Sequence, residues 1–212
     1  MKARISGLYA VTPDLHETSV LLAQTAQALA GGVRWLQYRN KAAARGLRRE
    51  QAVALQQLCA RHGAALIIND DIELARETDA AGVHVGADDA AVLVARASLG
   101  AGKIIGASCY NEIARVRAAS VEGADYVALG SFFASGVKPA AVRAAVALIA
   151  EARMATSLPV VAIGGITKNN AQELIDAGVD AIAVISGVFG ANNIEAAARS
   201  LGALFVSRHG HH

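Results

Sequence analysis

The sequence predicts an α/β protein of the (β/α)8 class, a TIM barrel. Two observations support this prediction. Short β-branched segments alternate with longer Ala/Leu-rich segments at helical spacing, and eight such strand segments can be counted. The 212 residues also suit one compact barrel at the small end for this fold. We therefore expect a single barrel domain over residues 1–208 and a short tail over residues 209–212.

The first half of the chain supplies four strand segments. They cover residues 8–11, 33–39, 65–69 and 83–85. A helix is expected after each strand of the chain, and its bounds are clear after the first three, where apolar residues recur at helical spacing. These three helices cover residues 18–30, 47–61 and 72–76. Gly31 and Gly32 end the first helix, as glycine commonly does at a helix C-terminus.

The second half of the chain repeats this pattern. Its strand segments cover residues 104–108, 126–130, 160–163 and 181–185. Its clearest helices cover residues 112–121, 140–154 and 194–205. A doubly wound open sheet is the alternative. It would usually have fewer strands and a glycine-rich first turn, whereas the first strand here runs into Thr12, Pro13 and Asp14.

The composition limits the class of protein and its partners. Hydrophobic residues make up 54% of the chain but aromatic residues only 4%, so the core is expected to consist of small aliphatic side chains. The net charge of +2, without a long Lys/Arg block, predicts no nucleic-acid partner. The sequence shows no signal-peptide pattern and no membrane-spanning apolar run. We therefore expect a cytoplasmic protein without a membrane partner, and leave a homo-oligomer open.

Polar residues at the end of the second strand suggest an anion site. Ligands of such barrels bind at the C-terminal ends of the strands. Gln37, Arg39 and Lys41 alternate along this strand and share one face, while Tyr38 and Asn40 point the other way. Two cations on a buried strand are costly without a partner. They suit a phosphate or pyrophosphate, and a salt-bridged strand end is the alternative.

Acidic residues follow the third and fourth strands. Asn69, Asp70 and Asp71 close the third, and Asp88 and Asp89 follow the fourth. Neighbouring strands lie about 4.8 Å apart, so these carboxylates can reach one cation. Mg²⁺ is usually held by one or two carboxylates together with phosphate oxygens. We expect Asp70 and Asp89 to be metal ligands, and Asp71 and Asp88 to cap the following helices.

The other strand ends suggest a second anion site. Ser108 places a hydroxyl at the end of the fifth strand, and Ser135 and Lys138 lie in the loop after the sixth. Gly165 and Ser186 follow the seventh and eighth strands, where barrel enzymes often bind phosphate. Two anion sites in one mouth suit an enzyme with two phosphorylated substrates, or with one bisphosphate.

Taken together, these motifs resemble the thiamine phosphate synthase family. The similarity extends over nearly the whole chain. It rests on Gln37-Tyr38-Arg39-Asn40-Lys41, Ile68-Asn69-Asp70-Asp71, His84-Val85-Gly86-Ala87-Asp88-Asp89, Gly106-Ala107-Ser108, Ala128-Leu129-Gly130 and Ala162-Ile163-Gly164-Gly165-Ile166. The resemblance implies a (β/α)8 fold and a transferase. A hydroxymethylpyrimidine pyrophosphate and a thiazole phosphate would give thiamine phosphate and pyrophosphate, with Mg²⁺ as cofactor.

The resemblance also implies roles for individual residues. Mg²⁺ would be held by Asp70 and Asp89. The catalytic residues would be Arg39, Lys41, Ser108 and Lys138. The substrate contacts would come from Gln37, Tyr38, Arg39, Asn40, Lys41, Asn69, Ser108, Ser135, Val137, Lys138, Gly165, Ile185 and Ser186. One position departs from the family, which usually has Thr-x-Thr-Lys where this chain has Ser135-Gly136-Val137-Lys138. Val137 thus lacks a hydroxyl that would contact the thiazole phosphate.

Three other functions remain as alternatives. A thiazole tautomerase on the same barrel would not need the pyrophosphate site. Phosphate-sugar barrels of amino-acid synthesis usually need a general acid and base near the first two strand ends, where we expect no acid. A barrel that only binds a phosphorylated metabolite would show no turnover. His84 is expected to pack near the end of the fourth strand rather than to bind a ligand.

Overall fold

The computed structural model of the chain describes residues 4–86, 91–134 and 142–206. Within these residues, eight parallel strands form a closed barrel, and β1 pairs with β8 to complete it. The strands are β1 (Gly7–Val11), β2 (Trp35–Tyr38), β3 (Ala65–Asn69), β4 (Gly82–Val85), β5 (Ile104–Tyr110), β6 (Tyr126–Gly130), β7 (Val160–Ile163) and β8 (Ala181–Val184). The predicted (β/α)8 class is confirmed.

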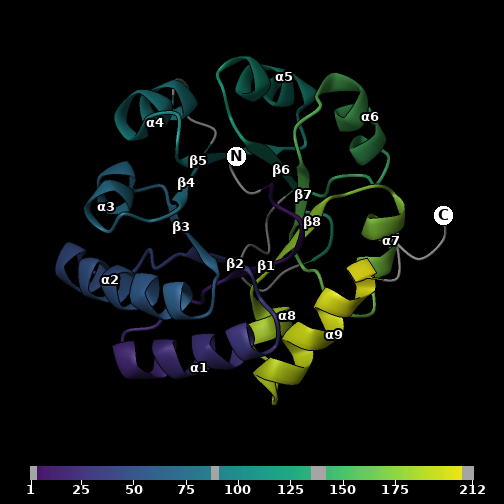
Figure 1. Cartoon of the computed structure of the whole chain (residues 1–212). Coiled ribbons are helices and arrows are strands. Elements are labelled where there is room, and N and C mark those ends of the chain that lie inside the picture. Colours follow the sequence, from purple (N-terminus) through teal and green to yellow (C-terminus); the bar gives the residue numbers. More distant parts are fainter. Residues whose placement is uncertain (1–3, 87–90, 135–141, 207–212) are drawn as a thin grey trace.

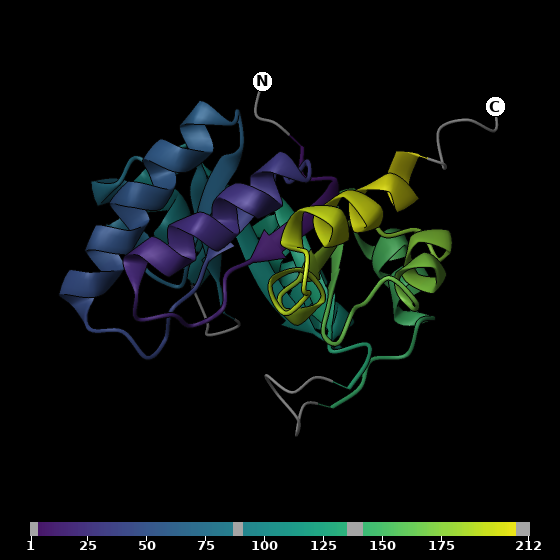
Figure 2. The same cartoon turned by 90° about the horizontal axis from the view of Figure 1, so that it is seen from below.

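Helices surround this barrel (Figure 1). They are α1 (Thr18–Ala30), α2 (Arg45–Arg61), α3 (Ile72–Glu77), α4 (Ala91–Leu99), α5 (Ile113–Val121), α6 (Leu148–Ala155), α7 (Ala171–Asp176), α8 (Ser186–Phe189) and α9 (Ile194–Val206). The first and last long helices, α1 and α9, pack against each other and close the ring (Figures 1 and 2). No helix in the described part of the chain is long and apolar enough to cross a membrane.

Most strand residues are buried, and the apolar side chains of most strands alternate between two cores. In β1, Leu8 and Ala10 belong to the large core between the barrel and its helices. Tyr9 and Val11 belong to the smaller core inside the barrel. This alternation follows from the two-residue period of a strand. Inward-facing residues near the C-terminal strand ends therefore lie directly beneath the barrel mouth.

Two features near the later strands differ from the sequence prediction. The helix expected over residues 140–154 begins only at Leu148, and the described residues before it, 142–147, contain no α-helix. There the Ala144 backbone N–H donates to the Ser131 carbonyl at 2.9 Å, so a tertiary bond outweighs the helix propensity of alanine. The one-turn helix α8 was not predicted. The other predicted ends agree to within two residues.

Candidate active site

A cavity of about 830 Å³ opens at the C-terminal ends of the strands. This size is typical of a small-molecule site. Its wall contains most of the predicted site residues that the structure describes. They are Gln37, Arg39, Lys41, Asn69, Asp70, Ser108, Gly165, Ile185 and Ser186. The barrel therefore brings together side chains from β2, β3 and β5 with the chain that follows β7 and β8.

Arg39 is held by an acid that was not predicted. Its Nη1 donates to both carboxylate oxygens of Asp14, at 3.1 and 3.0 Å. The Lys41 backbone N–H donates to the same carboxylate at 3.0 Å. The Thr12 hydroxyl secures this segment, since it donates to the Arg39 carbonyl and accepts from the Arg39 N–H. The expectation that no acid lies near the first two strand ends is therefore wrong.

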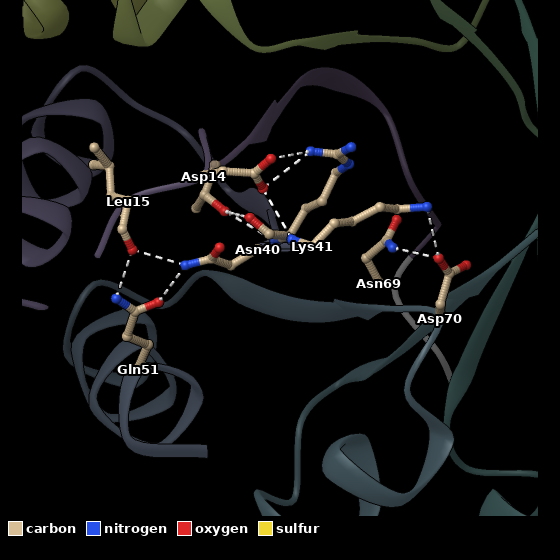
Figure 3. Close-up of polar contacts among 9 residues, drawn as sticks. Asp14, Leu15, Asn40, Lys41, Gln51, Asn69 and Asp70 are labelled. Carbon is tan, nitrogen blue, oxygen red and sulfur yellow. Dashed lines mark hydrogen bonds and ion pairs between the residues drawn. The ribbon is translucent and has the colours of Figure 1, made fainter. Parts of the chain in front are cut away.

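The Lys41 side chain reaches across the mouth to the end of β3. Its ammonium lies 3.3 Å from Asp70 Oδ2, and Asn69 Nδ2 donates to the same oxygen at 2.7 Å (Figure 3). The Asp70 backbone is left-handed, with φ at 61°, a conformation that is uncommon outside glycine and often marks functional sites. About half of each charged side chain is exposed. The Lys41 and Asp70 charged groups are therefore accessible to a ligand.

Tyr38 and Asn40, predicted among the substrate contacts, do not line this cavity. The Tyr38 hydroxyl donates to Gln51 Oε1 at 2.7 Å. Asn40 Nδ2 donates to the Leu15 carbonyl at 2.7 Å and to the same Gln51 oxygen at 3.0 Å (Figure 3). These bonds join the end of β2 to α2 and to the loop after β1. In the structure the two residues support the site from outside the barrel.

A chain of hydrogen bonds crosses the inside of the barrel beneath the cavity. Gln37 Nε2 donates to the Tyr9 hydroxyl, and this hydroxyl lies 2.9 Å from that of Tyr126. His84 contacts the Tyr126 hydroxyl through Nδ1 and Ser108 Oγ through Nε2, both at 2.9 Å. Burial lowers the pKa of His84 to about 4, so its imidazole is neutral at pH 7. The expectation that His84 packs near the end of β4 is confirmed.

Sequence reasoning missed Tyr9 and Tyr126. Both are fully buried inside the barrel, and burial raises the pKa of each phenol. Their rings meet edge to face, with centroids 5.9 Å apart. The available signal was a tyrosine at an inward position in a chain with only 4% aromatic residues. A large polar side chain inside a narrow barrel needs a partner for its hydroxyl.

Glycines bring backbone close to the cavity on the opposite side of the mouth. Gly165 has φ at 62°, and a Cβ there would lie 2.3 Å from the Ala134 carbonyl oxygen. Gly187, after β8, has no room for a side chain either, since its Cβ would lie 2.7 Å from the Ile166 carbonyl oxygen. Ser186 and Gly165 both border the cavity. This arrangement suits a compact anion that is bound partly by backbone groups.

Several predicted site residues lie outside the described part of the chain. They are Asp88, Asp89, Ser135, Val137 and Lys138. The described residues hold no group of three or more His, Cys, Asp or Glu side chains placed to bind a metal. Asp71 caps α3, as predicted, by accepting from the Leu74 N–H at 2.9 Å. Asp70 offers exposed carboxylate oxygens, which suit Mg²⁺ when a ligand phosphate supplies further oxygens.

Comparisons with known proteins agree on one family. The family model described as thiamine monophosphate synthase matches residues 8–188. A thiamine-phosphate synthase of Chromobacterium violaceum is 51% identical over 208 residues, which are 98% of this chain and all of the relative. One of Methylobacillus flagellatus is 53% identical over 201 residues, covering 95% of this chain and 96% of the relative.

One solved structure supports the same family, and another shares the fold. A thiamine phosphate pyrophosphorylase from Pyrococcus furiosus superposes with a TM-score of 0.86 at 33% identity, and the match covers 96% of this chain and 97% of the other. A 3-hexulose-6-phosphate synthase superposes with a TM-score of 0.72 at 19% identity, covering 93% of this chain and 99% of the other. This second likeness concerns the fold alone.

Proposed function

This chain belongs to the thiamine monophosphate synthase family, and from that premise we propose that it joins a hydroxymethylpyrimidine pyrophosphate to a thiazole phosphate and releases pyrophosphate, with Mg²⁺. The observation that supports this most is the layout of the cavity. Arg39, Lys41 and Asp70 border one side, and Gly165 and Ser186 border the other. One wall suits a charged leaving group and the other a second phosphate.

The first wall would bind and stabilise the pyrophosphate. The C–O bond of the pyrimidine substrate breaks, and its electron pair leaves with the pyrophosphate oxygen. Arg39 and Lys41 would stabilise this growing negative charge. Asp14 engages one guanidinium nitrogen of Arg39, which fixes the side chain and leaves other N–H donors for a ligand. Lys138 is predicted to add a third cation.

Asp70, together with the predicted ligand Asp89, would hold Mg²⁺. The ion supplies charge neutralisation for the leaving group. The Asn69 amide donates to Asp70 Oδ2, which orients the carboxylate. The Asp70 backbone N–H donates to the His84 carbonyl at 2.8 Å, which fixes the position of the residue between β3 and β4. These contacts place the carboxylate before a ligand arrives.

The second substrate would be bound beneath Gly165 and Ser186 and attack through its thiazole nitrogen. The nitrogen lone pair forms the new C–N bond to the pyrimidine methylene carbon, so no proton has to be removed from the nucleophile. Apolar side chains from β7 and β8 line this part of the cavity, among them Val161, Ile163 and Ala183. They would exclude water, which could otherwise capture the electron-poor carbon.

Purified full-length protein with both substrates tests this proposal. In the presence of Mg²⁺, we expect thiamine phosphate and pyrophosphate to form in equal amounts. When a chelator removes the Mg²⁺, neither product should form. Asp70→Asn should lower kcat/KM by about 100-fold or more, the usual loss when a charged group that acts in the transition state is removed. Asp176→Asn is the matched control, because Asp176 is exposed on α7 outside the cavity.

The outcomes separate the alternatives. Equal rates with and without chelator would refute the metal dependence. Binding of both substrates without turnover would indicate a barrel that only binds phosphorylated metabolites. Isomerisation of the thiazole phosphate alone, without pyrophosphate release, would indicate a tautomerase.

A further inference from the structure

The hydrogen-bonded chain inside the barrel joins two residues of the cavity wall. Gln37 stands at one end and Ser108 at the other, and both border the cavity. Tyr9, Tyr126 and His84 link them in that order through contacts of 2.9 Å. All three linking side chains are at least nine-tenths buried. The proton order along such a chain is constrained, because a buried donor without an acceptor is costly.

Gly106 makes this connection possible. In the barrel register it lies between His84 on β4 and Tyr126 on β6. A Cβ on Gly106 would lie only 2.0 Å from Tyr126 Cζ and 2.3 Å from its hydroxyl oxygen. The missing side chain therefore lets the Tyr126 ring extend over β5 toward His84. The two rings stack with centroids 5.5 Å apart and planes 23° from parallel.

The contacts allow an order of protons that runs in one direction from Gln37 to Ser108. Gln37 donates its amide N–H to the Tyr9 hydroxyl. Either hydroxyl can be the donor between Tyr9 and Tyr126, and in this order Tyr9 gives its single proton to Tyr126. Tyr126 then donates to Nδ1 of His84, which leaves the histidine proton on Nε2, where it is given to Ser108 Oγ. The Ser108 proton is thereby left for the cavity.

We propose that Tyr9, Tyr126 and His84 are positioning residues that fix the hydrogen-bond polarity of the active site through a His84 tautomer protonated on Nε2. Ser108 then presents a donor to the bound ring, and Gln37 presents its amide oxygen as an acceptor. This pair selects a ring with a hydrogen-bond acceptor that faces Ser108 and a hydrogen-bond donor that faces Gln37. An aminopyrimidine offers both groups. The identity of the ring rests on the proposed function, whereas the tautomer does not.

The tautomer can be measured directly, without substrate. Full-length protein labelled with ¹⁵N-histidine is examined by long-range ¹H–¹⁵N correlation at neutral pH, and the His84 signals are assigned by their loss in His84→Gln. We expect a protonated Nε2 and an unprotonated Nδ1. A proton on Nδ1, or an averaged mixture of both forms, would overturn the proposal. The result is decisive even if the chain forms no thiamine phosphate, so it is independent of the proposed function.

A variant tests the effect of polarity on substrate binding. Tyr126→Phe removes the hydroxyl that joins Tyr9 to His84. We expect a mixed His84 tautomer and a fall of about tenfold in kcat/KM for the pyrimidine pyrophosphate, the effect of one lost hydrogen bond. The KM for the thiazole phosphate should be unchanged. An unchanged tautomer with normal pyrimidine kinetics would refute the role of the chain.

Thr78→Val is the matched control for this variant. Its hydroxyl is also buried and donates to the Leu74 carbonyl at 2.7 Å, but it does not border the cavity. We expect both KM values and the His84 tautomer to stay as in the unsubstituted protein. An equal loss of pyrimidine kinetics in Thr78→Val would count against a specific role for Tyr126. If Tyr126→Phe does not fold, the tautomer of the unsubstituted protein still decides the proposal.

Discussion

Replacing Gly106 by alanine is a sharp test of the packing beneath the active site. The new Cβ would lie 2.0 Å from Tyr126 Cζ and 2.5 Å from its Cε1. Carbon atoms in contact stay about 3.5–4.0 Å apart, so the ring would have to move by roughly 1.5 Å. Tyr126 is fully buried, and its hydroxyl contacts Tyr9 and His84. The ring therefore cannot move without breaking these contacts.

The expected cost follows from these contacts. Overpacking a filled core costs about 1–3 kcal/mol. Two lost hydrogen bonds of the Tyr126 hydroxyl add about 1 kcal/mol each. We therefore expect Gly106→Ala to lower the free energy of unfolding by about 3–5 kcal/mol, a large share of the total stability of a typical domain. Urea unfolding, followed by circular dichroism, measures this change.

Two further variants show whether the clash is the cause. Gly46→Ala is the matched control, because Gly46 lies in the first turn of α2 with nothing within 4 Å of its Cβ. It should be neutral or stabilising by up to about 1 kcal/mol. In a Tyr126→Leu background, which removes the clashing atoms, Gly106→Ala should cost much less. A Gly106→Ala protein as stable as the unsubstituted one would refute the reasoning.

Three other predictions concern titration, thiols and the loop after β6. The pKa of His84 falls from 6.5 in the unfolded chain to about 4 in the folded protein. The unfolded state therefore binds the proton first, and about 3 kcal/mol of folding stability is lost as the pH drops from 6.5 to about 4. Urea unfolding between neutral pH and about pH 4 should show a shallower decline for His84→Gln, and parallel curves would contradict the assignment. Burial raises the pKa of both Cys59 and Cys109 to about 12, so neither thiol should react with a disulfide reagent until the protein is denatured. Rapid labelling of the native protein would count against this. Val137→Thr should lower the apparent KM for the thiazole phosphate about tenfold by restoring a hydrogen bond to a charged group, and an unchanged KM would show that this loop is wrongly assigned.

Most of the fold could be predicted because its elements have a clear period. Strands buried on both faces are short β-branched runs, and the helices around them have an apolar face. The prediction failed where a tertiary contact decides the local structure. Alanine-rich residues 142–147 do not continue α6 toward the N-terminus, because the Ala144 N–H bonds the Ser131 carbonyl. The helix α8, with four residues, is too short to show a period.

The candidate site was predicted in part for a similar reason. The C-terminal ends of parallel strands meet at one edge, so residues that follow β2, β3 and β5 had to gather there. Strand alternation also predicted that Tyr38 and Asn40 point away from Gln37, and in the structure they bond Gln51 instead of lining the cavity. The contact of Asp14 with Arg39 could not be predicted, since it depends on how the loop after β1 folds over the end of β2.

The ion pairs of the cavity bear on a choice that the sequence left open. Arg39 and Lys41 suggested either a phosphate site or a salt-bridged strand end. The structure contains the salt bridges, with Asp14 and Asp70 as partners. An exposed pair such as Lys41 with Asp70 contributes only about 0–1 kcal/mol, so a phosphate can take the ammonium at little cost. Arg39 is less exposed and has two bonds to Asp14, so it is held in place while its other donors stay available. Asp14 and Asp70 thus orient the two cations in the free protein. The salt bridges are therefore compatible with an anion site at this wall of the cavity.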